Sequence, residues 1–137
     1  MRAVFADATY WIALFNPRDS LHATANSVSS ELGQTRIVTS EMVLIEVLNS
    51  LSKPPDLRSK VVEAVSAIQA DPNTEVVPLS GIQFHDALRF FAAHTDKEWG
   101  LTDCASFVLM RDRAMTEALT HDRDFEQAGF RALLRST

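Results

Sequence analysis

Short apolar stretches alternate along the chain with longer stretches in which apolar residues recur every three or four positions. The short stretches are typical of strands buried in a sheet, and the longer ones of helices with one apolar face. The predicted strands are AVFA (3–6), RIVTS (36–40), TEVVPL (74–79), EALTHD (117–122) and, after a turn at Gly129, FRALL (130–134). Strands that alternate with helices predict an α/β fold with a parallel sheet of four to five strands flanked by helices.

Local signals indicate where the predicted helices begin and end. Ser40 is a suitable N-cap for a helix over residues 41–52, and Thr102 is one for a helix that carries Asp103 in its first turn. The PPD segment at 54–56 ends the first of these helices and begins another, whose apolar face holds Leu57, Val61, Val65 and Ile68. A further helix over residues 82–94 carries Phe84, Leu88 and Phe91 along one side.

Composition limits where the protein works and what attracts its partners. A length of 137 residues without a repeat or a linker predicts one domain over residues 1–137. Cys104 is the only cysteine, which excludes an internal disulfide and favours the reducing cytoplasm. The apolar N-terminal stretch is interrupted at Asp7, too early for a membrane span. Because the net charge is -5, attraction for a nucleic acid would have to come from local Lys and Arg residues or from bound cations.

Four acidic residues stand where a parallel sheet usually binds its ligands. Asp7 directly follows the first predicted strand, Asp122 stands at the end of the fourth, and Asp103 lies at the start of the helix before the fourth strand. Glu46 lies about two turns into the helix that follows the second strand. Ligands of such sheets bind beyond the carboxyl ends of the strands, where the strand order reverses. We therefore expect these four carboxylates to converge.

A cluster of this kind needs a positive partner, because each ionised carboxylate raises the pKa of its neighbours. Oxygen ligands without a group of Cys and His residues favour Mg²⁺ or Mn²⁺ over Zn²⁺. The natural chemistry of such a site is phosphodiester hydrolysis, in which one ion activates the attacking water and a second stabilises the leaving oxygen. The cations would also supply the positive potential that the chain lacks.

Four segments resemble the acidic blocks of the PIN-domain ribonucleases, especially the VapC-type toxins of toxin–antitoxin pairs. The segments are FAD with Asp7, SEMVLIEVLNSL with Glu46, GLTDCASFVLM with Asp103 and ALTHDRDFEQAGF with Asp122. They span nearly the whole chain in the right order. The resemblance implies a Rossmann-like PIN fold and an endoribonuclease that depends on Mg²⁺ or Mn²⁺. It also implies an RNA substrate, a homodimer and an antitoxin protein that plugs the active site.

Secondary candidates surround these acids. In the PIN family a hydroxyl residue often follows the first acid directly, whereas here Ala8 intervenes and Thr9 takes that role. Asp124 stands where related sequences often have a residue that is not acidic, so the fourth ligand is either Asp122 alone or a shared pair. We favour Asp122, with Thr120 as a hydrogen-bonding partner. Arg123 either contacts a phosphate or forms a salt bridge that balances the neighbouring acids.

Structural explanations compete with the functional ones. Asp7 could cap the helix that follows it, and Asp103 could interact favourably with a helix dipole. Glu46 is more telling, because its position between Val43 and Val47 predicts a buried side chain, and a buried Glu needs a partner. Two other functions also remain open. One is a non-cleaving PIN-type module that binds RNA or protein, and the other is a receiver-like Mg²⁺-binding signalling domain.

Overall fold

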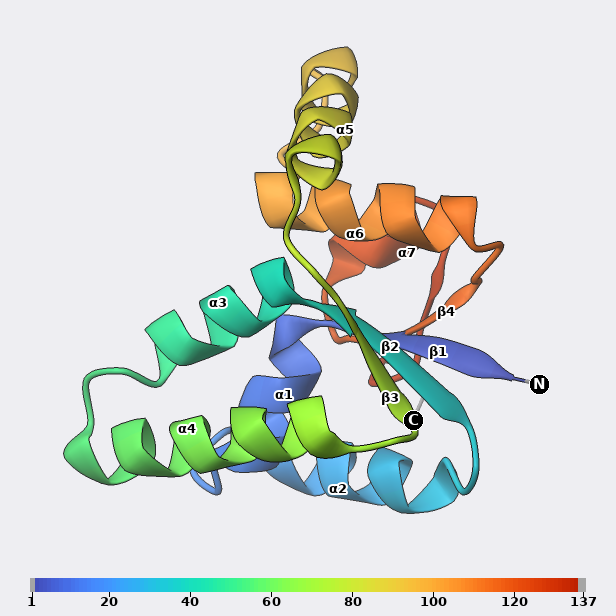
Figure 1. Cartoon of the computed structure of the whole chain (residues 1–137). Helices are drawn as coiled ribbons and strands as arrows, with labels where there is room; N and C mark the ends of the chain where they lie inside the picture. The colour runs from blue at the N-terminus through green and yellow to red at the C-terminus, as the bar shows by residue number, and fades with distance from the viewer. Residues whose placement is uncertain (1, 136–137) are drawn as a thin grey trace.

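The computed structural model describes residues 2–135, whose strands form a five-stranded sheet (Figure 1). The strands are β1 (Ala3–Ala6), β2 (Arg36–Ser40), β3 (Thr74–Val77), β4 (Glu117–Leu119) and β5 (Arg131–Ala132). Each strand pairs in parallel with its neighbours, in the order β3-β2-β1-β4-β5. The predicted α/β class and parallel sheet are therefore confirmed.

Helices cover both faces of this sheet. The helices are α1 (Ala8–Phe15), α2 (His22–Glu31), α3 (Glu41–Ser50), α4 (Pro55–Ala70), α5 (Gly81–Ala93), α6 (Leu101–Asp112) and α7 (Arg123–Gln127). Helices α1 to α4 lie on one face, and α5 to α7 lie on the other (Figure 1). The strand order consequently reverses between β1 and β4, which opens a crevice beyond the carboxyl ends of these two strands. Within residues 2–135, no helix has both the length and the apolar content to cross a membrane.

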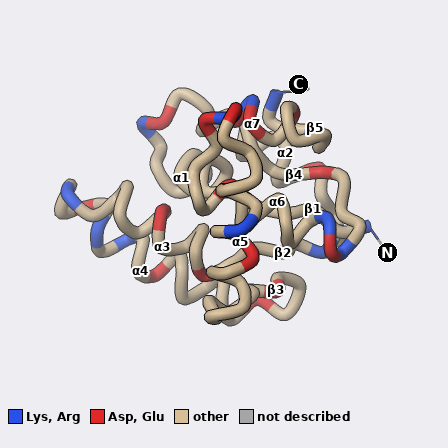
Figure 2. Tube along the Cα trace, turned by 90° about the horizontal axis from the view of Figure 1, so that it is seen from above, with Lys and Arg blue, Asp and Glu red and all other residues tan. Residues whose placement is uncertain are grey.

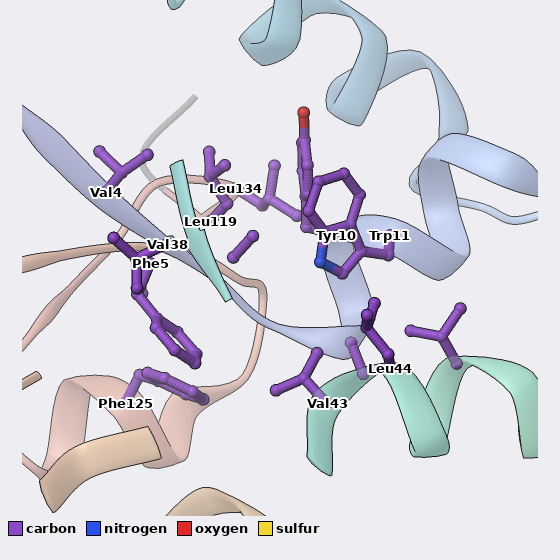
Figure 3. Close-up of a cluster of buried hydrophobic side chains, with 14 of the residues drawn as sticks. Val4, Phe5, Tyr10, Trp11, Val38, Val43, Leu44, Leu119, Phe125 and Leu134 are labelled. Atoms are coloured by element: carbon purple, nitrogen blue, oxygen red, sulfur yellow. The ribbon is translucent and has the colours of Figure 1, made fainter. Parts of the chain in front are cut away.

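The core forms around the central strand β1, whose Val4 and Phe5 are fully buried, as both faces of a parallel strand usually are. On one side the ring of Phe107 meets Phe125 edge to face at 4.9 Å. On the other side Tyr10 and Trp11 pack in the layer of α1 to α4 (Figure 3). Tyr10 and Trp11 therefore belong to the core, and they are not available to stack on bases.

The local helix signals are correct for the Ser40 cap and for the apolar face of α4, and wrong for Thr102. The Ser40 side chain accepts a hydrogen bond from the backbone N–H of Val43, so Ser40 is the N-cap of α3 as predicted. The four apolar residues predicted for α4 are all buried. Thr102 is not an N-cap, because α6 begins one residue earlier and Gly100 occupies the cap position. The Thr102 side chain is thus free to point elsewhere from the first turn.

Two helices carry too little apolar signal to have been predicted. Helix α2 buries only Ala25 and Val28, and its N-cap residue Leu21 makes no side-chain cap. Helix α7 has five residues, and Phe125 is its one buried residue. Both form because neighbouring elements cover them, which a pattern within the segment does not record.

We expect Ser40→Ala to lower the free energy of unfolding by about 1–2 kcal/mol, because Ser40 is buried and its cap bond is lost. Chemical denaturation would measure the change. Ser59→Ala is the matched control, since Ser59 is exposed on α4 and should change stability by less than about 0.5 kcal/mol. Equal effects of the two substitutions would contradict the role of the cap.

Candidate metal centre

Asp7 lies directly after β1 at the reversal of strand order, and only 3% of its surface is exposed. Its backbone N–H donates to the carbonyl of Leu119 in β4 at 3.1 Å, which holds the two strand ends together. Burial is the largest cause of a rise in the pKa of Asp7 to about 6. The negative charges of Glu46 and Asp122 raise this pKa further. The sheet thus holds a carboxyl group in a place that disfavours its charge.

Two threonine hydroxyls orient Asp7. Thr120 donates to its Oδ2 at 2.9 Å, and Thr9 donates to the same oxygen at 3.2 Å. The two hydroxyl oxygens lie 3.1 Å apart. Thr120 also accepts a hydrogen bond from the backbone N–H of Asp122 at 3.0 Å. Thr120 therefore connects Asp7 with the loop that carries Asp122.

Asp103, Asp122 and Asp124 form the tightest acidic group at this edge. One carboxylate oxygen from each lies within 4.8 Å of the others. Asp122 Oδ1 accepts from the backbone N–H of Asp124 at 2.9 Å and so caps α7. This hydrogen bond holds the backbone of Asp124 against the Asp122 side chain, and the two carboxylates lie in the same group. The structure thus brings both candidates for the fourth acidic position to the same place.

Repulsion among the acids is strongest at Asp103. Burial is the largest cause of the rise in its pKa to about 7, followed by the charge of Asp7. The charges of Asp122, Glu46 and Asp124 contribute in turn. Figure 2 shows both acidic and basic positions beside α7, the helix that carries Asp124. The site therefore has an unbalanced negative charge that a cation would neutralise.

Glu46 corrects one expectation. Its side chain is exposed, whereas the neighbouring positions Val43 and Val47 are buried, so the predicted burial of Glu46 is wrong. The position lies on the flank of the buried face, where a long side chain leaves the core. Partial desolvation is the main cause of a raised pKa of Glu46, which the Thr102 hydroxyl lowers and the charge of Asp122 raises. Glu46 thus faces the acidic edge but lies outside the group of three.

Other candidates are placed as follows. Arg123 is exposed, and no salt bridge joins it to an acid within the described residues, which removes the explanation that it balances Asp122 and Asp124. The backbone N–H of His121 donates to the Thr9 hydroxyl, while its ring is not among the grouped ligands. Cys104 is buried, and burial raises the pKa of its thiol, so it packs as a small apolar residue.

These residues fit a hard divalent cation. Three carboxylate oxygens converge within 4.8 Å, and the charges of Asp7 and Glu46 reach the same place. All the donors are oxygen atoms, which is the set that Mg²⁺ and Mn²⁺ prefer. The raised pKa values of Asp7 and Asp103 indicate repulsion that a bound cation would relieve. A cluster that can hold a metal ion is therefore present.

Comparison with known proteins agrees with this arrangement. A family model described as PIN domain matches residues 4–131. Among curated proteins, the 23S rRNA-specific endonuclease VapC20 from two strains of Mycobacterium tuberculosis is 29% identical over 127 residues. The match covers 93% of this chain and 95% of that protein.

Two solved structures share the fold. The crystal structure of Mycobacterium tuberculosis VapC20, described as a sarcin-ricin loop cleaving toxin, has a TM-score of 0.84 and 28% identity. That match covers 93% of this chain and 95% of that chain. The VapBC2 structure from Rickettsia felis, bound to a DNA fragment from their promoter, has a TM-score of 0.66. It is 11% identical over 95% of this chain and 96% of that chain, which shows the fold alone.

Proposed function

This chain belongs to the PIN-domain family, and we propose that it is a metal-dependent endoribonuclease that hydrolyses RNA phosphodiester bonds. The observation that carries the proposal is the convergence of Asp103, Asp122 and Asp124 beside the buried carboxyl of Asp7. The named relative is itself an endonuclease, and it aligns along nearly its whole length. Because the chain belongs to the PIN family, we reject the alternative of a receiver-like signalling domain.

We assign the metal ligands to Asp7, Glu46, Asp103 and Asp122, with Asp124 sharing the site. The ion would be Mg²⁺ or Mn²⁺. When bound, such an ion lowers the pKa of a water that attacks the phosphorus and stabilises the oxygen that leaves. The protein itself orients the Asp7 carboxylate through Thr9 and Thr120, and Thr120 also accepts a hydrogen bond from the backbone N–H of Asp122. The exposed guanidinium of Arg123 is available to contact a substrate phosphate.

We also propose that the protein is the toxin of a type II toxin–antitoxin pair that acts on cytoplasmic RNA. The similarity to VapC20 supports ribosomal RNA as the first substrate to test. An antitoxin would neutralise the site by supplying a positive side chain to the acids. A homodimer is part of this proposal, and light scattering on the purified protein would test it.

The deciding experiment is cleavage of total bacterial RNA by the purified protein with Mg²⁺ or Mn²⁺, with and without chelator. An Asp7→Asn/Asp103→Asn double variant, prepared from the same host, is the control for contaminating nucleases. We expect discrete cuts with 5′-phosphate and 3′-hydroxyl ends that require metal and are absent with the variant. Unchanged RNA, together with metal binding that only the variant loses, would instead favour a non-cleaving PIN-type binding module.

We expect Thr120→Val to reduce cleavage by about 10- to 100-fold, because loss of a residue that hydrogen-bonds to a metal ligand commonly lowers activity by this factor. The substitution removes the donor to Asp7 Oδ2 and the acceptor of the Asp122 N–H. A higher metal concentration should restore part of the activity. Thr116→Val is the control, because Thr116 is exposed before β4. If both variants cleave like the wild type at limiting metal, Thr120 does not position the acids.

A further inference from the structure

A pocket of about 260 Å³ lies where the loop between α5 and α6 folds back over the start of α6. Its walls include Phe91 from the end of α5, then His94, Lys97 and Trp99 from the loop, and Cys104 from α6. We call it the loop pocket. It is too small for a bulky ligand, since sites for drug-sized molecules measure about 300–1,000 Å³. Its size suits a single planar ring.

The loop pocket adjoins the acidic site. Cys104 in its wall follows Asp103 in the chain, and Gly100, which follows the wall residue Trp99, lies so close to Asp103 that a Cβ at Gly100 would be 3.9 Å from Asp103 Oδ2. Trp99 Nε1 donates to Gln127 Oε1 at 2.9 Å, which ties the loop to α7. A strand of RNA at the acids would therefore pass this loop.

The wall of the loop pocket is held in place by packed aromatic rings. His94 stacks on Phe90 with ring centroids 4.1 Å apart, and Trp99 meets Phe107 of the core at 5.1 Å. His94 Nδ1 lies 2.7 Å from the carbonyl oxygen of Phe90 and donates its proton there. In the neutral ring this leaves Nε2 as an acceptor. The wall is therefore rigid before any ligand arrives, which lowers the entropic cost of binding.

The groups that remain accessible combine an aromatic face with a positive charge. Phe91 is 46% exposed. The Lys97 ammonium lies 5.9 Å from the centre of the Trp99 ring, and its ion pair with Asp96 is solvent-exposed at 3.4 Å. Proteins that hold single-stranded nucleic acid use aromatic rings to stack on bases and cations to contact phosphates. The apolar face of Phe91 therefore complements a base, and the charge of Lys97 complements a phosphate.

We propose that the loop pocket is a base-binding subsite, which holds one unpaired nucleobase of the RNA strand whose scissile phosphate lies at the acids. The base stacks on Phe91, its edge faces His94 Nε2, and Lys97 contacts a flanking phosphate. The proposal rests on the proposed nuclease function for its substrate. It assigns the choice of cleavage position in part to these three residues.

The test measures RNA binding apart from cleavage. Fluorescein-labelled eight-nucleotide oligoadenosine and oligouridine are titrated with Asp103→Asn protein in Mg²⁺, and anisotropy reports binding. Adding Phe91→Ala should weaken the tighter of the two complexes about tenfold, as loss of one stacked base does. Adding Lys97→Gln should weaken both complexes and reduce their dependence on salt. Phe84→Ala is the matched control, because Phe84 lies on the same helix, is 43% exposed and does not line the pocket.

Cleavage of total RNA by Phe91→Ala and Phe84→Ala in the otherwise unchanged protein completes the test. We expect the cut positions to change with Phe91→Ala alone. Equal affinities for the two variants, with the same cuts, would overturn the subsite and leave the nuclease intact. A change of oligomeric state in Phe91→Ala would also overturn it, because Phe91 would then contact protein. Weaker binding by Phe91→Ala in a wild type that cuts no RNA would support the subsite and reject the nuclease.

Discussion

Replacing Asp103 with asparagine is expected to lower metal-dependent RNA cleavage by more than about a hundredfold. Loss of an outer partner of a ligand already costs about 10- to 100-fold, and Asp103 supplies one of the three converging oxygens itself. An amide keeps the shape of the side chain but removes its charge, so the site holds a divalent cation less tightly. Isothermal titration with Mn²⁺ and initial cleavage rates would measure the two effects separately.

Asp112→Asn is the matched control for Asp103→Asn. Both residues lie on α6, but Asp112 is exposed at the far end of the helix and outside the acidic group. The control should leave cleavage and Mn²⁺ binding within about twofold of the wild type, because isolated surface substitutions have small effects. Substantial activity in Asp103→Asn, above the level of the double variant, would reject the assignment of Asp103 as a ligand.

A second expected result is that Asp7→Asn stabilises the metal-free protein at pH 7 while it removes activity. The pKa of Asp7 is 3.8 in an ordinary environment and about 6 in the fold. A raised pKa means that the folded state binds the proton more tightly than the unfolded state does. The contribution of Asp7 to metal-free stability is therefore most favourable below about pH 4 and is lost as pH rises through about 6. At pH 7 the ionised carboxylate costs about 3 kcal/mol, which a neutral side chain avoids.

Chemical denaturation of both proteins in chelator, from pH 4 to pH 8, would measure this difference. The gain from Asp7→Asn should be close to its full value at pH 7 and above, and should shrink toward pH 4. Because Asp103 also has a raised pKa, part of the pH dependence will remain in the variant. Added Mn²⁺ should stabilise the wild type more than the variant. A variant that is less stable than the wild type at every pH would show that the charge of Asp7 is not unfavourable in the fold.

The positions of the principal acids could be predicted because they depend on strand ends. Asp7 follows β1 and Asp122 follows the end of β4, and a parallel sheet brings such ends to one edge whatever the loops do. The order of the elements was sufficient to place Asp103 near that edge as well. The order of the elements along the chain therefore predicted where these three acids lie.

What the sequence did not reveal depends on side-chain direction. Glu46 was expected to be buried from its neighbours Val43 and Val47, yet a helix turns by about 100° per residue, and this position falls on the flank. The closeness of Asp124 to Asp122 follows from the cap of α7, a helix of five residues with no periodicity to detect. The loop pocket depends on ring stacking between residues of α5, the loop and α6, which no local pattern predicts.

Asp122 serves both the fold and the site, since its Oδ1 caps α7 while its carboxylate takes part in the acidic group. Its loss would loosen the helix that holds the Trp99 side chain through Gln127. Asp103 has no such second role as a cap. In a gene that drifts after its activity is no longer selected, substitutions at Asp103 should therefore accumulate before substitutions at Asp122. Descendants that have lost Asp103 but retain Asp122 would then be folded proteins without nuclease activity.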